Sequence, residues 1–265
     1  MYEFNYHRPK TLDEASRTTK EAEDGQVLAG GMTMIPSMKL RLASPSDLVD
    51  LADIDGLKGI TLGPGTLTIG AMTRHHDVHT SPDVQKAIPA LAALAGGIGD
   101  PSVRHRGTIG GSVANSDPAA DYPAAVLGLD ATVETNTRKI AADDFFTGLF
   151  ETALETGEII TAVHFKIPDA AAYMKFPQPA SGFAMVGAFV AKFGGEVRLA
   201  VTGAQDCVFR MTEMEHALAA NFSPDAVAEI TIAEDDLLAD IHCGADYRAH
   251  LVTVMAKRAV ALAAG

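Results

Sequence analysis

Two short glycine-containing stretches have the residue types that bind anions through backbone groups. The first, Ala29-Gly30-Gly31-Met32-Thr33-Met34-Ile35, follows the apolar pair Val27-Leu28, and a helix is predicted to start over 37–42 with Pro36 in its first turn. Glycine adopts positive φ without strain and exposes backbone N–H groups, and the start of a helix adds unpaired N–H donors. The order of strand, glycine turn and helix start therefore predicts a site for phosphate.

The second stretch, Thr108-Ile109-Gly110-Gly111-Ser112, again has an apolar residue before a glycine pair and a hydroxyl residue after it. Two such turns can hold one diphosphate between them if the fold brings them together, with the hydroxyls of Thr33, Thr108 and Ser112 as further donors. Alone, each stretch is more typical of an ordinary turn, and neither matches G-x-G-x-x-G or a phosphate loop that ends in Gly-Lys-Ser/Thr. The hypothesis of an anion site therefore depends on the pair.

Other kinds of site are less well supported. The chain has no Gly-x-Ser-x-Gly motif of a serine hydrolase. His75, His76 and His79 lie close in the sequence, but zinc sites usually add cysteine or acidic ligands, so a surface turn with one packed histidine is favoured and no metal site is predicted. Arg104 and Arg106 precede the second stretch. They could balance the charge of a phosphate or form ion pairs with acidic residues at the surface, and the sequence favours neither role.

Composition narrows the class of protein. With 265 residues, 47% of them hydrophobic, the chain can bury one large core or two to three smaller ones. A net charge of −13 argues against a nucleic-acid partner. No apolar run is long enough to span a membrane and no signal peptide is recognisable, so we expect a cytoplasmic protein. Cys207 and Cys243 cannot supply the four ligands of an iron–sulfur cluster, so any such cluster belongs to a partner.

The elements that must position these residues follow from apolar periodicity and from capping signals. A capping box at 11–14 predicts a helix up to Gly25, and strands at 27–28 and 48–51 complete a β-α-β subdomain over 1–55. A second subdomain, 56–170, has a hairpin at 60–62 and 67–69, helices from Ser81, Ala90 and Pro123, and strands at 131–134 and 159–167. A linker over 170–181 leads to a hairpin at 183–193 and 197–201 and to helices at 212–220, 224–230 and 245–264.

The residues around the second stretch carry a family resemblance. The sequence Arg104 to Asn115, continued by Asp117 to Ala124, resembles the FAD-binding medium subunit of the molybdenum hydroxylases, which include aerobic carbon monoxide dehydrogenase and xanthine dehydrogenase. Ala29 to Ile35 is similar to that family's other flavin loop. The resemblance covers nearly the whole chain. It implies an α+β fold in which two N-terminal α/β subdomains form a flavin-binding domain of the vanillyl-alcohol-oxidase/PCMH type over 1–171, beside a small C-terminal α+β domain over 172–265.

The resemblance also implies roles for single residues. Asp121 corresponds to a carboxylate that binds FAD hydroxyls, although a helix cap before Tyr122 is compatible too. Ile160 matches an apolar flavin contact or is simply a buried strand residue. Lys175 matches a lysine that stabilises the reduced, anionic flavin, and otherwise it would be called a surface lysine. Phe183 lies where the family often has an aromatic residue near the flavin, or it is the first core residue of a strand.

The site implied by the resemblance binds FAD without a covalent link and contains no catalytic residue for the substrate. Its cofactor-binding residues are Ala29, Gly30, Gly31, Met32, Thr33, Met34, Thr108, Ile109, Gly110, Gly111, Ser112, Asp121, Ile160 and Lys175. One departure is the run Phe176-Pro177-Gln178-Pro179, because the family commonly has basic residues there.

The function predicted is that of an FAD-binding electron-transfer subunit, and hence of an oxidoreductase component. Electrons pass from iron–sulfur clusters on a small partner subunit through FAD to an acceptor, while the molybdenum cofactor oxidises the substrate on a large partner subunit. A dimer of heterotrimers is expected. The alternatives are a stand-alone FAD-dependent oxidase or dehydrogenase of the same fold superfamily, for which the C-terminal part is small, and a cofactor-free binding protein that has kept the fold.

Overall fold

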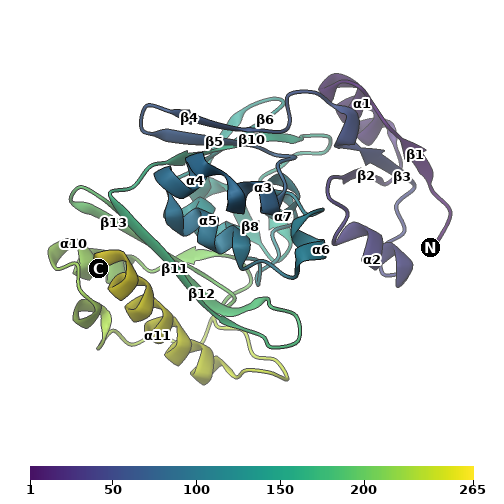
Figure 1. Cartoon of the computed structure of the whole chain (residues 1–265). Helices are drawn as coiled ribbons and strands as arrows, with labels where there is room; N and C mark the ends of the chain where they lie inside the picture. The colour runs from purple at the N-terminus through teal and green to yellow at the C-terminus, as the bar shows by residue number, and fades with distance from the viewer.

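The computed structural model describes residues 1–265, and its N-terminal part is a small parallel β-α-β subdomain (Figure 1). Its three strands have the order β1-β3-β2 and are all parallel. Thr11 caps the first helix, as the capping box predicts, but the helix ends before Gly25, which begins the next strand. The elements are β1 (Asn5–His7), α1 (Leu12–Glu21), β2 (Gly25–Leu28), α2 (Met34–Lys39), β3 (Asp47–Asp50) and η1 (Leu51–Asp53).

The second subdomain is built on a five-stranded antiparallel sheet with the order β4-β5-β10-β6-β7. The predicted hairpin is β4 (Ile60–Gly63) and β5 (Thr66–Gly70), and the long strand β10 (Ile160–Lys166) is central. Short helices cover one face of the sheet. They are α3 (His75–Thr80), α4 (Pro82–Ala87), α5 (Pro89–Gly96), α6 (Pro101–Arg104), α7 (Ile109–Asn115), α8 (Tyr122–Gly128) and α9 (Ala142–Phe145), and the other strands are β6 (Thr132–Thr135), β7 (Lys139–Ala141), β8 (Phe146–Gly148) and β9 (Glu151–Thr152).

The C-terminal part is a four-stranded antiparallel sheet, in the order β11-β12-β13-β14, that is covered by helices on both faces. Phe189 and Ala191 of its central strand join the core under the helices of the second subdomain, whereas Ala188 and Val190 face α11. This alternation is the period of two expected for a strand that is buried on both faces. The elements are β11 (Ala170–Pro177), β12 (Ala184–Phe193), β13 (Glu196–Thr202), β14 (Phe209–Arg210), α10 (Thr212–Ala220), η2 (Pro224–Val227) and α11 (Ala245–Ala264).

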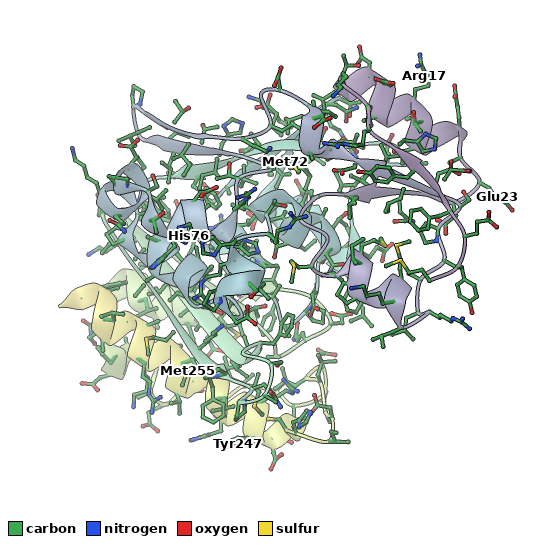
Figure 2. The ribbon with its side chains drawn as sticks, turned by 45° about the vertical axis from the view of Figure 1, so that its right-hand side comes forward. Arg17, Glu23, Met72, His76, Tyr247 and Met255 are labelled. Atoms are coloured by element: carbon green, nitrogen blue, oxygen red, sulfur yellow. The ribbon has the colours of Figure 1, made fainter.

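Side chains fill the spaces between these layers (Figure 2). Met255 of α11 is fully buried against the C-terminal sheet, whereas Tyr247 near the start of the same helix is exposed. Met72 is buried at the junction of the two N-terminal subdomains, in one core cluster with Val49 and Ile159. The molecule is thus a continuous stack of sheets and helices, and the predicted α+β class is confirmed.

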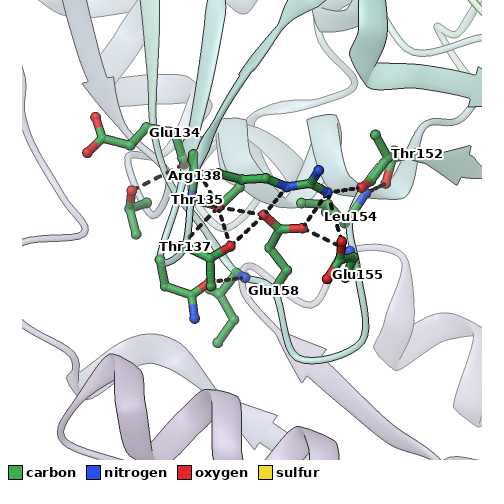
Figure 3. A network of polar contacts seen from close by, with 12 residues as sticks. Glu134, Thr135, Thr137, Arg138, Thr152, Leu154, Glu155 and Glu158 are labelled. Atoms are coloured by element: carbon green, nitrogen blue, oxygen red, sulfur yellow. Dashed lines mark hydrogen bonds and ion pairs between the residues drawn. The ribbon is translucent and has the colours of Figure 1, made fainter.

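A buried carboxylate stabilises the junction of the two N-terminal subdomains (Figure 3). Glu158 accepts hydrogen bonds from Arg138 Nε at 2.9 Å, Thr135 Oγ1 at 2.7 Å and Thr137 Oγ1 at 2.8 Å. Arg138 makes the largest contribution to lowering the pKa of Glu158 to about 2. The carbonyl group of the preceding residue, Gly157, accepts a hydrogen bond from the Ser16 hydroxyl of α1 at 2.7 Å. The network around Glu158 therefore fixes the turn that contacts the N-terminal subdomain.

A second polar network joins the C-terminal sheet to the rest of the molecule. The guanidinium of Arg198 on β13 is only 4% exposed and donates to Leu127 O at 3.0 Å and to Asp130 Oδ1 at 3.0 Å. It also donates to Asp143 Oδ1 at 2.5 Å. All three acceptors lie in the second subdomain, so the two parts share a polar interface as well as a core.

The prediction of a linker over 170–181 is wrong for most of its length, because residues 170–177 form the edge strand β11. Its prolines suggested a break, but Pro177 is the last residue of the strand, where a missing N–H does little harm. Helix α2 begins at Met34 rather than at Ser37, and the helix predicted over 224–230 is only the short 3-10 turn η2. No helix combines the length and the apolar character that crossing a membrane requires.

Candidate functional site

The fold brings the two glycine stretches into contact. A Cβ atom built on Gly30 would lie 2.2 Å from the carbonyl oxygen of Arg106 and 2.7 Å from the Cα of Gly107. A Cβ built on Gly111 would lie 3.3 Å from the Cβ of Ala29. Only glycine at position 30 allows the backbones to approach so closely. A shared diphosphate site requires that the fold bring the two stretches together, and the structure meets this requirement.

The first stretch has the open backbone that was predicted. Gly31 has a φ of +74°, in the left-handed region that favours glycine. No backbone N–H from Gly30 to Thr33 donates a hydrogen bond within the protein. Thr33 is the N-cap of α2, but its side chain does not cap the helix, and both Met32 and Thr33 are exposed. Several consecutive N–H groups are thus free to bind an anion.

The second stretch differs from the prediction of a glycine turn with exposed N–H groups. Gly110 and Gly111 lie in the first turn of α7, neither has a positive φ, and Thr108 is the N-cap. The N–H groups of Ile109 and Gly110 donate to Thr73 O at 3.0 Å and Ala71 O at 2.8 Å, and that of Gly111 to the Thr108 hydroxyl at 3.2 Å. Because these N–H donors are used, the groups left for a ligand are two hydroxyls: that of Thr108, which only accepts a hydrogen bond here, and the half-buried one of Ser112, which makes no hydrogen bond in the protein.

Asp121 and Lys175 form a buried ion pair next to this region. Asp121 is 5% exposed, its carboxylate lies 3.0 Å from the Lys175 ammonium, and it accepts a 2.6 Å hydrogen bond from the hydroxyl of Tyr173. Burial raises the pKa of Asp121, and Lys175 followed by Tyr173 act in the opposite direction. The alternative role of Asp121 as a helix cap is wrong, because it occupies the N-cap position of α8 without capping through its side chain.

Lys175 is not a surface lysine, since its side chain is only 14% exposed. Besides Asp121, its ammonium donates to the carbonyl groups of Gly97, the C-cap of α5, at 2.9 Å and of Gly182, in the turn after β11, at 2.8 Å. The lysine therefore joins the second subdomain to the C-terminal sheet at the site.

The C-terminal sheet also fixes the backbone that leads to Asp121. Gly203 N–H donates to Pro118 O at 2.7 Å, and Ala184 N–H donates to Ala119 O at 3.2 Å. The buried hydroxyl of Thr202 lies 2.8 Å from Pro118 O and 2.7 Å from Ala120 O. Sequence reasoning missed this arrangement because its partners are more than 60 residues apart and consist largely of backbone atoms.

The other predicted residues are placed as follows. Ile160 is 4% exposed and lies at the start of β10, beside an irregularity in the pairing with β6. Phe183 precedes β12 and is 47% exposed, so it is not a core residue of that strand. Arg104 donates to the carbonyl groups of Ile98 and Gly99, a role that neither alternative included. Arg106 is exposed and makes no ion pair.

His75 connects the glycine contact to Asp121. Its backbone N–H donates to Gly107 O at 3.0 Å, and its ring packs 5.3 Å from that of Tyr122, the neighbour of Asp121. Burial, with Arg104 as a second cause, lowers the pKa of His75 to about 4, so the ring is neutral. The buried His75 Nδ1 and Tyr122 hydroxyl have no hydrogen-bond partner. No group of three histidine, cysteine, aspartate or glutamate side chains is arranged to hold a metal ion.

Known proteins resemble this chain over nearly its whole length. The sequence profile of the family described as FAD binding domain in molybdopterin dehydrogenase matches residues 2–169. The chain is 36% identical to the carbon monoxide dehydrogenase medium chain of Hydrogenophaga pseudoflava, covering 97% of this chain and 96% of that one. It is 32% identical to the nicotine 6-hydroxylase medium subunit of Paenarthrobacter nicotinovorans, with the same two coverages. The structure of reconstituted CO dehydrogenase from Oligotropha carboxidovorans superposes with a TM-score of 0.90 at 34% identity, covering 99% of this chain and 98% of that chain.

Proposed function

Because this chain belongs to the family of FAD-binding domains in molybdopterin dehydrogenases, we propose that its open glycine loop and its Asp121–Lys175 pair hold one FAD without a covalent link. The predicted function, an FAD-binding subunit of an oxidoreductase of the molybdenum hydroxylase type, is confirmed by relatives that match at least 97% of this chain. The stand-alone oxidase and the cofactor-free binding protein are accordingly less favoured.

The contact between the two glycine stretches is the observation that supports the proposed site best. Gly30 lies directly against Arg106 and Gly107, in a space that a Cβ would fill, and the N–H groups that follow it have no acceptor in the protein. A diphosphate needs such donors, because it brings several acceptor oxygens and negative charge into a partly desolvated position. The residues present therefore fit an anionic dinucleotide cofactor.

The proposed cofactor-binding residues divide by chemistry. Backbone donors come from the first stretch, and hydroxyl donors come from Thr33, Thr108 and Ser112. Asp121 is an acceptor for sugar hydroxyls and Lys175 a cation near the ring. We propose the same cofactor-binding residues that the sequence analysis named. They are Ala29, Gly30, Gly31, Met32, Thr33, Met34, Thr108, Ile109, Gly110, Gly111, Ser112, Asp121, Ile160 and Lys175.

FAD, when bound, supplies a centre that accepts and passes on one or two electrons. This chain's own residues bind it, keep water from part of the site and hold a positive charge there. Lys175 supplies that charge from a position that is largely buried, where an ammonium acts more strongly than at the surface. No residue of this chain is assigned to proton transfer at the organic substrate.

The assembly that we propose has three kinds of subunit. The relatives are called medium chains or medium subunits, which supports a large partner with the molybdenum cofactor and a small partner with iron–sulfur clusters. A dimer of such heterotrimers, a cytoplasmic location and a domain boundary between 171 and 172 are parts of the same proposal. The end of the family match at residue 169 and the start of β11 at Ala170 support the boundary.

Acid precipitation of the tagged chain, purified from its host with its partner subunits, tests the noncovalent FAD. The yellow colour should pass into solution with the spectrum of free FAD, whereas colour that stays in the pellet contradicts the proposal.

Reconstitution tests the electron-transfer role. Substrate-dependent reduction of an acceptor should require all three subunits, and turnover by this chain alone at a rate typical of enzymes, roughly 1–1,000 per second, would instead indicate a stand-alone oxidase.

A further inference from the structure

Tyr173 is a polar residue at the site that the family resemblance did not indicate. It lies on β11 two residues before Lys175, so both side chains leave the strand on the same face. Its hydroxyl donates a 2.6 Å hydrogen bond to Asp121 Oδ1, while Lys175 Nζ lies 3.1 Å from Asp121 Oδ2. The ammonium also lies 3.0 Å from Oδ1, so it spans both oxygens of the buried carboxylate, and the phenol adds a second, shorter contact to Oδ1.

The surroundings of Tyr173 hold its hydroxyl in this position. The ring stacks on Phe189 of β12 at a centroid distance of 6.1 Å, which fixes the plane of the phenol. The hydroxyl lies against Gly187, where a Cβ would approach it to 2.3 Å, so glycine at that position provides the space. The tyrosine is thus held by the C-terminal sheet and directed at a residue of the second subdomain.

We propose that Tyr173 is a positioning residue, which anchors Oδ1 of the Asp121 carboxylate and so orients the carboxylate for FAD together with the Lys175 ammonium. This inference rests on the proposed function, because it assumes that Asp121 binds the cofactor. With the phenol in place, Oδ1 accepts from two donors and the orientation of the carboxyl group is restrained by the phenol as well as by the ammonium. Without the phenol, Lys175 alone restrains Asp121, and the carboxylate keeps only one strong donor.

The charged and titratable groups that face Asp121 are few. Lys175 and Tyr173 come from β11, and Tyr122 follows Asp121 on α8. Donors stabilise the ionised carboxylate, and loss of the Tyr173 donor therefore raises the pKa of Asp121. If FAD binding needs the anion, FAD affinity will decline with falling pH, and the decline will begin at a higher pH once the phenol is removed.

The test is FAD affinity of the full chain, purified with its partner subunits through a tag and stripped of flavin, measured by fluorescence titration between pH 4.5 and 8. Tyr173→Phe keeps the ring and its stacking on Phe189, and should weaken FAD binding about tenfold or more at neutral pH, since a hydrogen bond to a charged group is lost. Its affinity should also start to fall at a higher pH than that of the wild type.

Tyr122→Phe is the matched control, because it removes a buried hydroxyl that has no hydrogen-bond partner next to the same aspartate. It should leave both the affinity and the pH profile unchanged. A double-mutant cycle then tests whether Tyr173 acts on FAD binding through Asp121. If it does, Tyr173→Phe should have little further effect in an Asp121→Asn background.

Each outcome decides between the hypotheses. If the wild-type assembly binds no FAD, the proposed function fails. If it binds FAD and Tyr173→Phe changes neither affinity nor pH profile, or if its effect is fully additive with Asp121→Asn, the inference about Tyr173 fails while the proposed function stands.

Discussion

Gly31 lies in an open turn with a φ of +74°, whereas Gly110 lies in the first turn of α7 and is buried against Ala71. Around Gly31 the backbone N–H groups have no acceptor, but the N–H of Gly110 is already bonded to Ala71 O at 2.8 Å. Two similar glycine pairs thus meet different physical requirements. In the first stretch, glycine permits a conformation and a close approach between loops, and in the second it permits tight packing of a helix against its neighbours.

The largest effect is expected for Gly110→Val. The new Cβ would lie 2.5 Å from the Ala71 Cβ and 2.8 Å from its carbonyl oxygen, so the start of α7 must move away. We expect the free energy of unfolding to fall by about 3 kcal/mol or more, as for severe overpacking, measured by urea denaturation. If the second stretch were instead an open glycine turn that binds the diphosphate, as the sequence predicts, the variant would stay folded and lose FAD. A variant with wild-type stability that loses only FAD would restore that view and make the two stretches equivalent.

Gly30→Ala should come next, with its effect mainly on the cofactor. Its Cβ would lie 2.2 Å from Arg106 O, which forces the two stretches apart. We expect FAD affinity to fall at least about tenfold, or 1.4 kcal/mol, with a smaller loss of stability than in Gly110→Val. Gly195→Ala is the control, because nothing lies within 4 Å of the position of its Cβ. Unchanged FAD affinity in Gly30→Ala would show that contact between the stretches does not matter for binding.

Gly31→Ala should have a moderate effect. Its Cβ meets only the flexible side chains of Ile35 and Leu28, but the left-handed backbone costs an alanine about 1–2 kcal/mol. We expect that loss in thermal unfolding, together with a several-fold weaker FAD affinity. Gly31→Asn should recover much of both, since asparagine tolerates this conformation better. Equal losses in the two variants would point to a steric cause instead.

Gly111→Ala should have the smallest effect. This residue is helical, and its Cβ would lie 2.9 Å from the Thr108 hydroxyl and 3.3 Å from the Ala29 Cβ. Alanine gains roughly 0.8–1 kcal/mol over glycine in a helix, which offsets this crowding. We expect the free energy of unfolding to change by less than about 0.5 kcal/mol, measured by denaturation. A larger loss would mean that the second stretch, like Gly30, depends on the contact between loops.

Local signals predicted much of the fold. Helices α10 and α11 have the predicted bounds, and the hairpin β4–β5 follows from a Gly-Pro-Gly turn between alternating residues. The strand β11 was missed because Pro177 and Pro179 suggested a break, while the alternation that precedes them is weakened by three alanines. Whether such a segment is a strand depends on the neighbour that it pairs with, which no local pattern reveals.

For the candidate site, the sequence indicated which residues to consider but not their geometry. Asp121 and Lys175 were named from the family resemblance, but their ion pair joins positions 54 residues apart. Tyr173 carried one readable signal, its spacing of two residues from Lys175, which becomes meaningful only if the segment is a strand. The satisfied N–H groups of the second stretch could not be foreseen, since their acceptors at residues 71 and 73 are placed by the fold.

The hydrogen bonds of Thr202 to Pro118 and Ala120 also bear on the order of events during biosynthesis. The ribosome adds roughly 5–20 residues per second, so Ala120 is made roughly 4–16 s before the threonine that lies 82 residues later. In that interval the nascent chain lacks Thr202 to hold this segment, and until residue 175 is added it also lacks Lys175 to pair with Asp121. If Asp121 and Lys175 hold FAD as proposed, we expect flavin loading to follow translation of the C-terminal sheet, and a premature stop before Thr202 to release a flavin-free fragment for quality-control proteases.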